Sequence, residues 1–217
     1  SIAERMEHTM RNVVPVTITC RCDASGMIKL RNQLKAAAED NATSFNDIIL
    51  KITAGALKAH PILTGRWNGK SIQLPEKMHI GFAVDTEEGL LVPVLQNVGN
   101  LRLSEITHQS RELIESARAR RLKPEQMRDG CFTITNLGSF GVEAFTPIIH
   151  FPETAILGIG AIISEAVPLA DGTIVTLPQL TMSLTFDHRA IDGAPAARFL
   201  QTLRQRLESP SVWLLND

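Results

Sequence analysis

Ionisable side chains gather at the end of a strand-like run near the C-terminus. The apolar residues of this run alternate: Leu180, Met182, Leu184 and Phe186. Side chains two positions apart share one face of a strand. If the strand continues for two residues, His188 joins the apolar face and its imidazole points toward the protein interior. An imidazole that is held by hydrogen bonds and titrates near neutrality is suited to act as a general base.

Asp192 lies four residues after His188 and immediately before a glycine. Gly193 can take backbone conformations that are closed to other residues, so the carboxylate of Asp192 can point back and fix the loop. A structural role is the alternative, with Asp192 in a salt bridge to Arg189 or Arg21. The spacing of a histidine and an aspartate near a strand end does not by itself establish an enzyme.

Strands and helices are expected along the chain before and after this loop. Runs rich in apolar and β-branched residues predict strands, at residues 13–22, 132–137, 154–163 and 179–186. Residues 79–85 and 90–95 are expected to pair across an acidic turn. The dipeptides Asn68-Gly69 and Asp171-Gly172 predict two short hairpins with type I′ turns. Amphipathic periodicity predicts helices, at residues 23–39, 103–122 and from Gly193 onward.

The clearest helix signal begins at Ser44, a good N-cap residue with Asp47 three positions later. Apolar residues then recur at helical spacing until Pro61, which ends the helix. Leu50 and Leu57 add a second apolar face, so the sequence predicts a largely buried helix.

This mixture of elements favours the α+β class. Helices and strands do not alternate strictly, so we expect a mixed β-sheet sandwich with helices packed on one face. The 217 residues lie at the upper end of what one hydrophobic core supports, which predicts a single domain over residues 1–217. Because the chain begins at Ser1 and runs directly into a helix-like segment, we expect it to be part of a longer protein.

Composition excludes several classes of function. The 22 Lys and Arg residues balance 23 Asp and Glu residues, so the net charge of −1 lacks the basic footprint of a nucleic-acid binder. The basic run at Arg118, Arg120 and Arg121 is interpreted as the solvated end of a helix. No stretch is apolar enough to span a membrane and no signal peptide is evident, which predicts a soluble, cytoplasmic protein.

The three cysteines are an odd number, which argues against a disulfide framework and for a reducing compartment. Cys20 and Cys22 lie in a strand-like run without a second pair at zinc spacing, so buried or half-buried thiols are expected. The histidines outside the 188 loop have no partner pattern either. We therefore expect no metal site.

Several segments together resemble one family. Phe186-Asp-His188-Arg-Ala-Ile-Asp192-Gly193 is similar to the signature of the dihydrolipoamide acyltransferases of 2-oxo acid dehydrogenase complexes, a motif shared with chloramphenicol acetyltransferase. Further segments match in order along almost the whole chain: Ile2-Ala-Glu-Arg-Met6, Asn46-Asp-Ile-Ile-Leu-Lys51, Gly89-Leu-Leu-Val-Pro-Val94, Phe132-Thr-Ile-Thr-Asn-Leu-Gly138, Phe145-Thr-Pro-Ile-Ile149 and Ala155-Ile-Leu-Gly158. The resemblance implies a chloramphenicol acetyltransferase-like fold.

The resemblance also implies a reaction and its residues. His188 becomes the general base, with Asp192 beside it, and Thr135 supplies the hydroxyl that steadies the oxyanion. Asn136 contributes polar contacts to the bound substrate. Coenzyme A is a substrate and the second thiol belongs to a lipoyl group, which is carried on a domain that this chain lacks, as it lacks the subunit-binding domain. The acyl group is undetermined, with acetyl favoured.

In this family the site lies between the subunits of a homotrimer, so His188 and Thr135 are expected to come from neighbouring chains. The trimers assemble further into a cubic or dodecahedral core, and residues 212–215 are either a docking element or an ordinary packed tail. Decarboxylase and dihydrolipoamide dehydrogenase components are the expected partner enzymes. In a eukaryote the expected location is the mitochondrial matrix.

The sequence leaves two other functions open. One is an antibiotic O-acetyltransferase of the chloramphenicol type, which shares the histidine motif but lacks the Thr135-Asn136-Leu137-Gly138 segment found here. The other is a non-catalytic core protein in which the histidine and aspartate only brace a trimer.

Overall fold

A mixed sheet of six strands forms the centre of the protein in this computed structural model, which describes residues 2–37 and 42–214. In spatial order the strands are β1 (Pro15–Asp23), β10 (Ile174–Asp187), β9 (Ala155–Pro168), β8 (Phe132–Asn136), β4 (Ile80–Phe82) and β7 (Val94–Leu95). β9, β8 and β4 run parallel, whereas the neighbours at both edges are antiparallel. The predicted mixed α+β architecture is confirmed.

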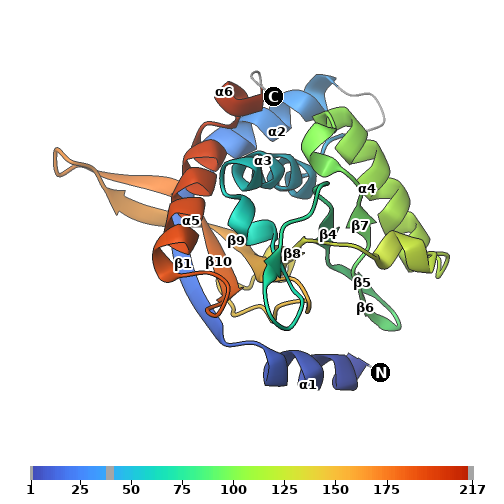
Figure 1. The fold of residues 1–217 in the computed structure, drawn as a ribbon. Helices are drawn as coiled ribbons and strands as arrows, with labels where there is room; N and C mark the ends of the chain where they lie inside the picture. The colour runs from blue at the N-terminus through green and yellow to red at the C-terminus, as the bar shows by residue number, and fades with distance from the viewer. Residues whose placement is uncertain (1, 38–41, 215–217) are drawn as a thin grey trace.

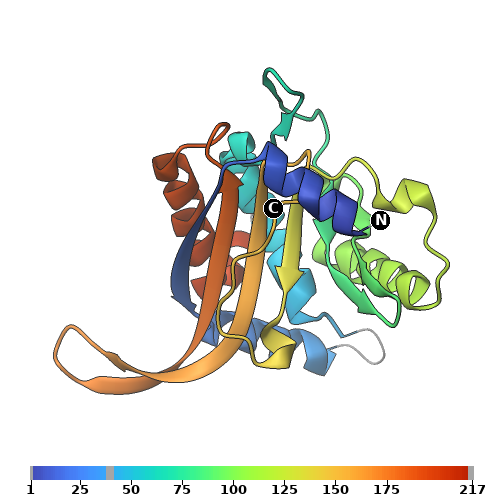
Figure 2. The same cartoon turned by 90° about the horizontal axis from the view of Figure 1, so that it is seen from below.

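Helices cover one face of this sheet (Figure 1). They are α2 (Ser25–Ala37), α3 (Phe45–Ala59), α4 (Leu103–Arg118), α5 (Gly193–Glu208) and α6 (Pro210–Leu214). The first helix, α1 (Ile2–Asn12), lies apart from them, below the sheet in the view of Figure 1 and in front of it in Figure 2. It meets the body of the protein where His8 packs edge-on against Phe151, with ring centroids 5.0 Å apart.

The buried core lies between the sheet and these helices. The predicted apolar face of β10 contributes to it, since Leu180, Met182, Leu184 and Phe186 are all buried. Phe132 of β8 packs against Phe199 of α5 with ring centroids 5.8 Å apart. Burial of these large side chains supplies most of the free energy that holds the helices on the sheet.

Helix α3 confirms the strongest helix signal in the sequence. Ser44 accepts a hydrogen bond from the backbone N–H of Asp47 at 3.2 Å, and the Asp47 carboxylate accepts from the backbone N–H of Ser44 at 2.8 Å. This reciprocal capping satisfies two N–H groups that a helix start otherwise leaves unpaired. Residues 47–57 are all buried, as the two apolar faces predict. Pro61 begins a 3₁₀ turn, η1 (Pro61–Thr64).

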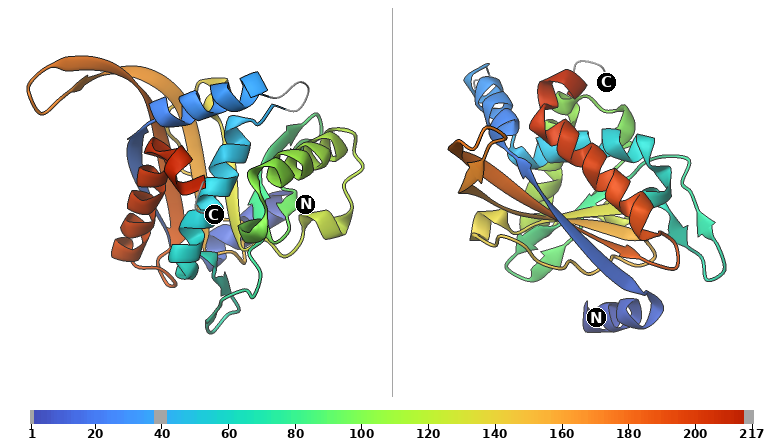
Figure 3. Two further views of the ribbon diagram at one scale, coloured as in Figure 1. Left: turned by 90° about the horizontal axis from the view of Figure 1, so that it is seen from above. Right: turned by 90° about the vertical axis from the view of Figure 1, so that its left-hand side faces the viewer.

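The long hairpin of β9 and β10 departs from the prediction. Each strand has 14 residues, and together they form an arm that projects from the body (Figure 3). Asp171-Gly172 lies at its tip, where Gly172 has a φ of +84° but Asp171 is not in the left-handed region. A type I′ turn needs positive φ at both residues, so the predicted turn type is wrong.

A second hairpin, β2 (Arg66–Trp67) with β3 (Ile72–Gln73), was predicted in the right place with the wrong turn. Only Gly69 of the dipeptide has positive φ, at +96°. The side chain of Asn68 accepts hydrogen bonds from the backbone N–H groups of Lys70 and Ser71, at 3.0 and 2.8 Å. The loop is thus closed by an asparagine side chain, which replaces part of the hydrogen bonding of a tight turn.

The remaining helices and strands form where the sequence predicts them, but they begin or end at different residues. The segment at residues 79–95 divides into β4 and β7 in the large sheet and a separate hairpin of β5 (Val84–Thr86) and β6 (Gly89–Leu91). Three short 3₁₀ turns complete the chain: η2 (Val98–Asn100), η3 (Pro124–Met127) and η4 (Gly138–Phe140). The helix predicted at residues 23–39 begins later, at Ser25, because Asp23 still pairs with Gln179 in the sheet. Its predicted end at residues 38 and 39 lies outside the described residues.

The basic run at the end of α4 lies on the surface, as predicted. Arg118, Arg120 and Arg121 are exposed at the end of α4, and the guanidinium of Arg120 lies 2.8 Å from the Glu88 carboxylate. The interpretation of this basic run as a solvated helix end is confirmed. No helix within residues 2–37 and 42–214 is long and apolar enough to cross a bilayer.

Candidate active site

The strand before His188 ends one residue after its predicted end at Phe186, and one residue short of the continuation to His188 that an inward-facing imidazole required. β10 ends at Asp187, and the backbone N–H groups of Ala190 and Ile191 donate to the Asp187 carbonyl at 2.9 and 3.0 Å, which turns the chain away from the sheet. The His188 side chain is 43% exposed. The ring lies beside the buried Phe186 ring, with centroids 5.7 Å apart, but its own chain does not enclose it. The expectation that the imidazole points into the interior of its own chain is therefore wrong, because the alternation of a strand no longer applies at this residue.

Asp187 and Arg189 lock the backbone on both sides of His188. The Asp187 side chain is 1% exposed, and its carboxylate accepts hydrogen bonds from the Arg189 side chain at 3.0 Å and from the backbone N–H of Val14 at 3.2 Å. Burial works to raise the pKa of Asp187, but the hydrogen bonds from Arg189 and Val14 outweigh it and hold the pKa below its ordinary value. The His188 N–H itself donates to the Val14 carbonyl at 2.8 Å.

Asp192 lies near His188 but makes no direct hydrogen bond to it. Its Oδ1 lies 3.8 Å from Nδ1 of His188, an ion-pair distance that is too long for a hydrogen bond. The Asp192 side chain is 84% exposed at the N-cap position of α5, where it makes no capping hydrogen bond. The two alternative partners are engaged elsewhere, because Arg189 binds Asp187 and Arg21 binds Glu165 at 2.8 Å.

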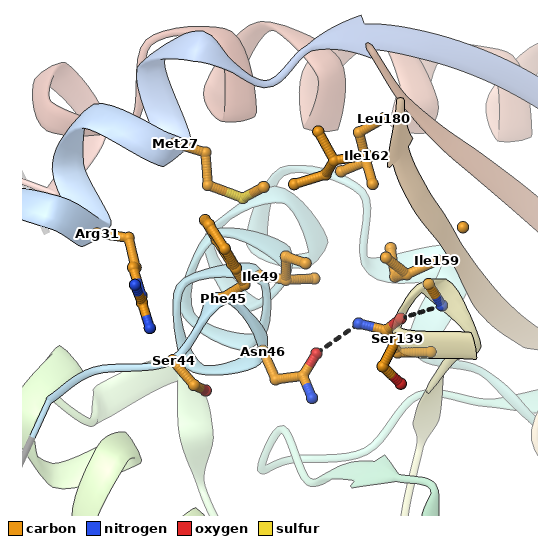
Figure 4. A pocket seen from close by; sticks show the side chains of 13 residues that line it. Met27, Arg31, Ser44, Phe45, Asn46, Ile49, Ser139, Ile159, Ile162 and Leu180 are labelled. Atoms are coloured by element: carbon orange, nitrogen blue, oxygen red, sulfur yellow. Dashed lines mark hydrogen bonds between the residues drawn. The ribbon is translucent and has the colours of Figure 1, made fainter. Parts of the chain in front are cut away.

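Thr135 and Asn136 lie on β8, toward the other end of the sheet. Phe132 and Ile134 face the core, so Thr135 belongs to the opposite face, where it is half-buried. Asn136 is held by two hydrogen bonds (Figure 4). Its amide donates to Oδ1 of Asn46 at 2.6 Å, and its own Oδ1 accepts from the Gly138 N–H at 2.8 Å.

A cavity of about 420 Å³ opens beside Asn136. It is bounded by α2, the start of α3, the η4 turn and the β9 and β10 strands (Figure 4). Arg31 reaches from α2 toward the start of α3, with its guanidinium 5.4 Å from the centre of the Phe45 ring. The buried Nε of Arg31 has no hydrogen-bond partner within the described part of the chain. A buried N–H without a partner is costly, so this cavity favours a ligand with acceptor oxygens.

His188 and Thr135 of one chain lie far apart. Thr135 pairs with Gly158 on β9, which pairs with Ser183 on β10, five residues before His188. Five residues of strand and two strand spacings correspond to a separation of about 19 Å. The fold thus brings His188 to Asp192 and Thr135 to Asn136, but it does not bring the two pairs together within one chain.

The three cysteines, which could act as metal ligands or nucleophiles, are free thiols that are largely shielded from solvent. Cys22 and Cys131 are buried and Cys20 is half-buried, all as free thiols, which confirms that prediction. Burial raises the pKa of Cys22 to about 12 and those of Cys20 and Cys131 to about 11. No group of three or more His, Cys, Asp or Glu side chains within residues 2–37 and 42–214 is arranged to hold a metal ion.

Similarity to a solved structure defines the fold class of this chain, and similarity in sequence defines its family. The fold is that of chloramphenicol acetyltransferase, with a TM-score of 0.57 at 16% identity over 94% of each chain. The sequence also matches the family described as 2-oxoacid dehydrogenases acyltransferase (catalytic domain) over residues 1–215. This chain belongs to that family.

Relatives within the family are substantially more similar. The acetyltransferase component of the acetoin cleaving system of Bacillus subtilis is 40% identical over 99% of this chain and 54% of its own length. The acetyltransferase component of the pyruvate dehydrogenase complex of Bacillus subtilis is 37% identical over 99% of this chain and 49% of its own length. This chain thus spans about half the length of the curated relatives it matches.

Among solved structures, the dihydrolipoamide acetyltransferase of Azotobacter vinelandii aligns with a TM-score of 0.93 and 35% identity, over 98% of this chain and 88% of its own. A serine, a histidine and an asparagine of that protein were investigated for their role in its catalytic mechanism. The cubic core of a pyruvate dehydrogenase complex aligns equally well, with a TM-score of 0.93.

Proposed function

We propose that this chain transfers an acetyl group between the thiols of dihydrolipoamide and coenzyme A, with His188 as general base. The observation that carries the proposal is an exposed imidazole on a rigid frame, with Asp192 four residues later. The histidine and asparagine studied in the Azotobacter vinelandii enzyme have the same spacing of four residues, and its serine precedes the histidine by 52 residues. Thr135 precedes His188 by 53 residues, one more than in that enzyme, and the residue at a spacing of 52 is Asn136. Of these two neighbours only Thr135 carries a hydroxyl, as serine does, which supports Thr135 as the counterpart of that serine.

Thr135 is proposed to come from the neighbouring subunit of a homotrimer. The separation of about 19 Å between Thr135 and His188 in one chain is too large for both to touch one thioester. The exposure of the His188 ring fits a site that a second chain completes and shields from water.

The reaction follows from these groups. A thiol has a reference pKa of about 8.5 and an imidazole about 6.5, so full proton transfer before attack would cost about 2.7 kcal/mol. We therefore draw the thiol proton passing to Nε2 of His188 while sulfur attacks the thioester carbonyl carbon. The carbonyl oxygen becomes an oxyanion, which the Thr135 hydroxyl stabilises by donating a hydrogen bond. Collapse of this intermediate breaks the old C–S bond, and the imidazolium returns its proton to the departing sulfur.

Asp192 is proposed to favour the imidazolium. At 3.8 Å its carboxylate attracts a positive charge on His188 through partly solvated space, and this charge exists only after the thiol proton has been transferred. An asparagine at this place, as in the Azotobacter vinelandii enzyme, would act through its dipole instead. The substitution of a full charge is the main departure of this chain's proposed site.

Coenzyme A is proposed to occupy the cavity beside Asn136. The unpartnered Nε of Arg31 can donate to a phosphate or carbonyl oxygen, and apolar side chains such as Phe45 and Ile159 can cover its pantetheine arm. Asn136 is already fixed by Asn46 and Gly138, so it can contact the ligand without further loss of conformational freedom.

The assembly and the partner enzymes of this chain are proposed from its similarity to the relatives. We infer that homotrimers of this chain build a cubic or dodecahedral core that works with decarboxylase and dihydrolipoamide dehydrogenase components. The lipoyl group would be delivered by a domain outside the 217 residues of this sequence. The proposed location is the cytoplasm, or the mitochondrial matrix in a eukaryote.

The test is acetyl transfer from acetyl coenzyme A to free dihydrolipoamide by wild-type protein, His188→Ala and a matched control. His108→Ala is the control, because His108 is also exposed and lies 3.6 Å from Glu112, again four residues later. Removal of a general base is expected to lower kcat by about 10²–10⁴-fold, while the control keeps wild-type activity. Light scattering must show an unchanged assembly in both variants. Full activity in His188→Ala would exclude this residue as the base.

The same assay separates the two alternative functions. An O-acetyltransferase would prefer chloramphenicol or another hydroxyl acceptor over dihydrolipoamide. A core protein without catalysis would assemble normally and transfer no acetyl group in its wild-type form.

A further inference from the structure

Trp67 is the last residue of β2, directly before the hairpin loop at residues 68–71, and it has no role in the proposed chemistry. Its indole ring lies under the guanidinium of Arg189, 4.8 Å from ring centre to carbon. Arg189 directly follows the proposed base, and its side chain also holds the Asp187 carboxylate at 3.0 Å. The indole therefore contacts a side chain that fixes the His188 loop.

The hairpin that carries Trp67 is itself fixed to the segment that leads into β9. The Trp67 N–H donates to the Pro152 carbonyl at 2.9 Å, and the Thr154 N–H donates to the Gly65 carbonyl at 3.2 Å. The Thr154 carbonyl in turn accepts from the Asp187 N–H at 2.9 Å. Trp67 and the start of the His188 loop are thus tied to the same short segment, residues 152–154, so their relative position is set by backbone hydrogen bonds.

We propose that Trp67 is a positioning residue for the base: its ring holds the Arg189 guanidinium in the plane that binds Asp187, and so keeps His188 in its reactive orientation. The guanidinium has one face on the indole and its edge on the carboxylate, an arrangement that a planar cation accepts without strain. Without the ring, Arg189 regains rotamer freedom and the turn formed by Asp187, Ala190 and Ile191 opens more often.

The consequence for catalysis rests on the proposed function. A cation–π contact at a partly exposed site corresponds to about a threefold to thirtyfold change in the population of the ordered loop. Trp67→Ala is therefore expected to lower kcat by about threefold to thirtyfold. The KM for coenzyme A should stay unchanged, because the cavity with Arg31 lies toward the other end of the sheet.

A measurement without any enzyme activity tests the same idea. Hydrogen–deuterium exchange of the assembled protein reports the amides of His188, Ala190 and Ile191, which donate hydrogen bonds to the carbonyls of Val14 and Asp187. In Trp67→Ala these amides should exchange about threefold to thirtyfold faster, while peptides from the central strands stay protected. Trp67→Phe keeps an aromatic face and should lie between wild type and Trp67→Ala in both measurements.

Trp213→Ala is the matched control. The second tryptophan of the chain stacks on Arg206 at 4.6 Å, a contact of the same kind at α6. Trp213→Ala should leave the exchange of the His188 loop unchanged. Unchanged exchange in Trp67→Ala, faster exchange everywhere, or a Phe variant as impaired as the Ala variant would each overturn the proposal. If wild-type protein transferred no acetyl group, the proposed function would fail, and the exchange data would still decide the role of Trp67.

Discussion

Coexpression of His188→Ala and Thr135→Ala chains tests whether two subunits share one active site. Within one chain the two residues are separated by about 19 Å of sheet, from the pairing of Thr135 with Gly158 and of Gly158 with Ser183. Each variant alone should be nearly inactive. Loss of a general base costs about 10²–10⁴-fold, and loss of an oxyanion donor about 10²–10³-fold.

The expected recovery follows from counting sites. In the proposed trimer, if chains mix at random, each site draws its histidine from one chain and its threonine from the next. With equal amounts of the two variants, about one quarter of the sites regain both residues, so about one quarter of wild-type kcat should return. This is at least about twenty-five times the activity of either parent, given the losses expected for each.

A second mixture gives the matched control. Wild-type chains are coexpressed with a chain that carries both substitutions. Sites within single chains would then retain about one half of wild-type activity, whereas shared sites retain about one quarter. Purified trimers are assayed for acetyl transfer after mass spectrometry has established the subunit ratio. No recovery from the first mixture together with one half from the second would refute the shared site.

Two further predictions concern ionisable groups away from the chemistry. Because burial raises the pKa of Cys20, Cys22 and Cys131 to about 11 or 12, native protein should react slowly with iodoacetamide at pH 8, and mass spectrometry should find full labelling only after unfolding. Because the pKa of folded Asp187 is depressed, the unfolded chain binds the proton first. The ionised Asp187 carboxylate therefore stabilises the folded protein above about pH 4, and this contribution is lost as pH falls through the depressed pKa. In urea unfolding, the free energy of unfolding should fall less on acidification in Asp187→Asn than in wild type.

Local signals in the sequence predicted the framework well. The helix after Ser44 was correct in its cap, its burial and its end, because capping and apolar periodicity are properties of adjacent residues. The free thiols and the basic helix end were correct for the same reason. The motif around His188 led to the right family because its residues are close together in the chain.

Features set by distant pairing were not predictable. The orientation of His188 depended on where β10 loses its neighbours, and that point is set by Pro15 on β1 and Ala155 on β9. The long arm was missed because Pro178 and the polar residues near it resemble a loop. A proline is tolerated there because the register of β1 ends at Asp23, opposite Gln179, and Pro178 needs only its carbonyl on that side, which accepts from the Ala24 N–H at 2.8 Å.

The cavity residue Arg31 had no signal that local reasoning could use. One arginine in an amphipathic helix is most often a solvated residue, and its unpartnered Nε becomes visible only when α2 is placed over α3. Trp67 was similar, since its importance depends on Arg189, which is 122 residues later. Residues that act through contacts across the fold require coordinates for their assignment.

Exposure of His188 and rigidity of its loop belong to one physical problem. In the proposed shared site, the surface that covers His188 arrives only with the partner chain, and within its own chain the His188 ring lies beside one buried ring, that of Phe186, at 5.7 Å. Each chain must therefore fix the imidazole backbone before assembly, and here Asp187, Arg189 and Val14 do so through hydrogen bonds within the chain. The conformational entropy of the loop is then lost during folding, so in the proposed trimer assembly would add the oxyanion donor Thr135 without also having to position His188.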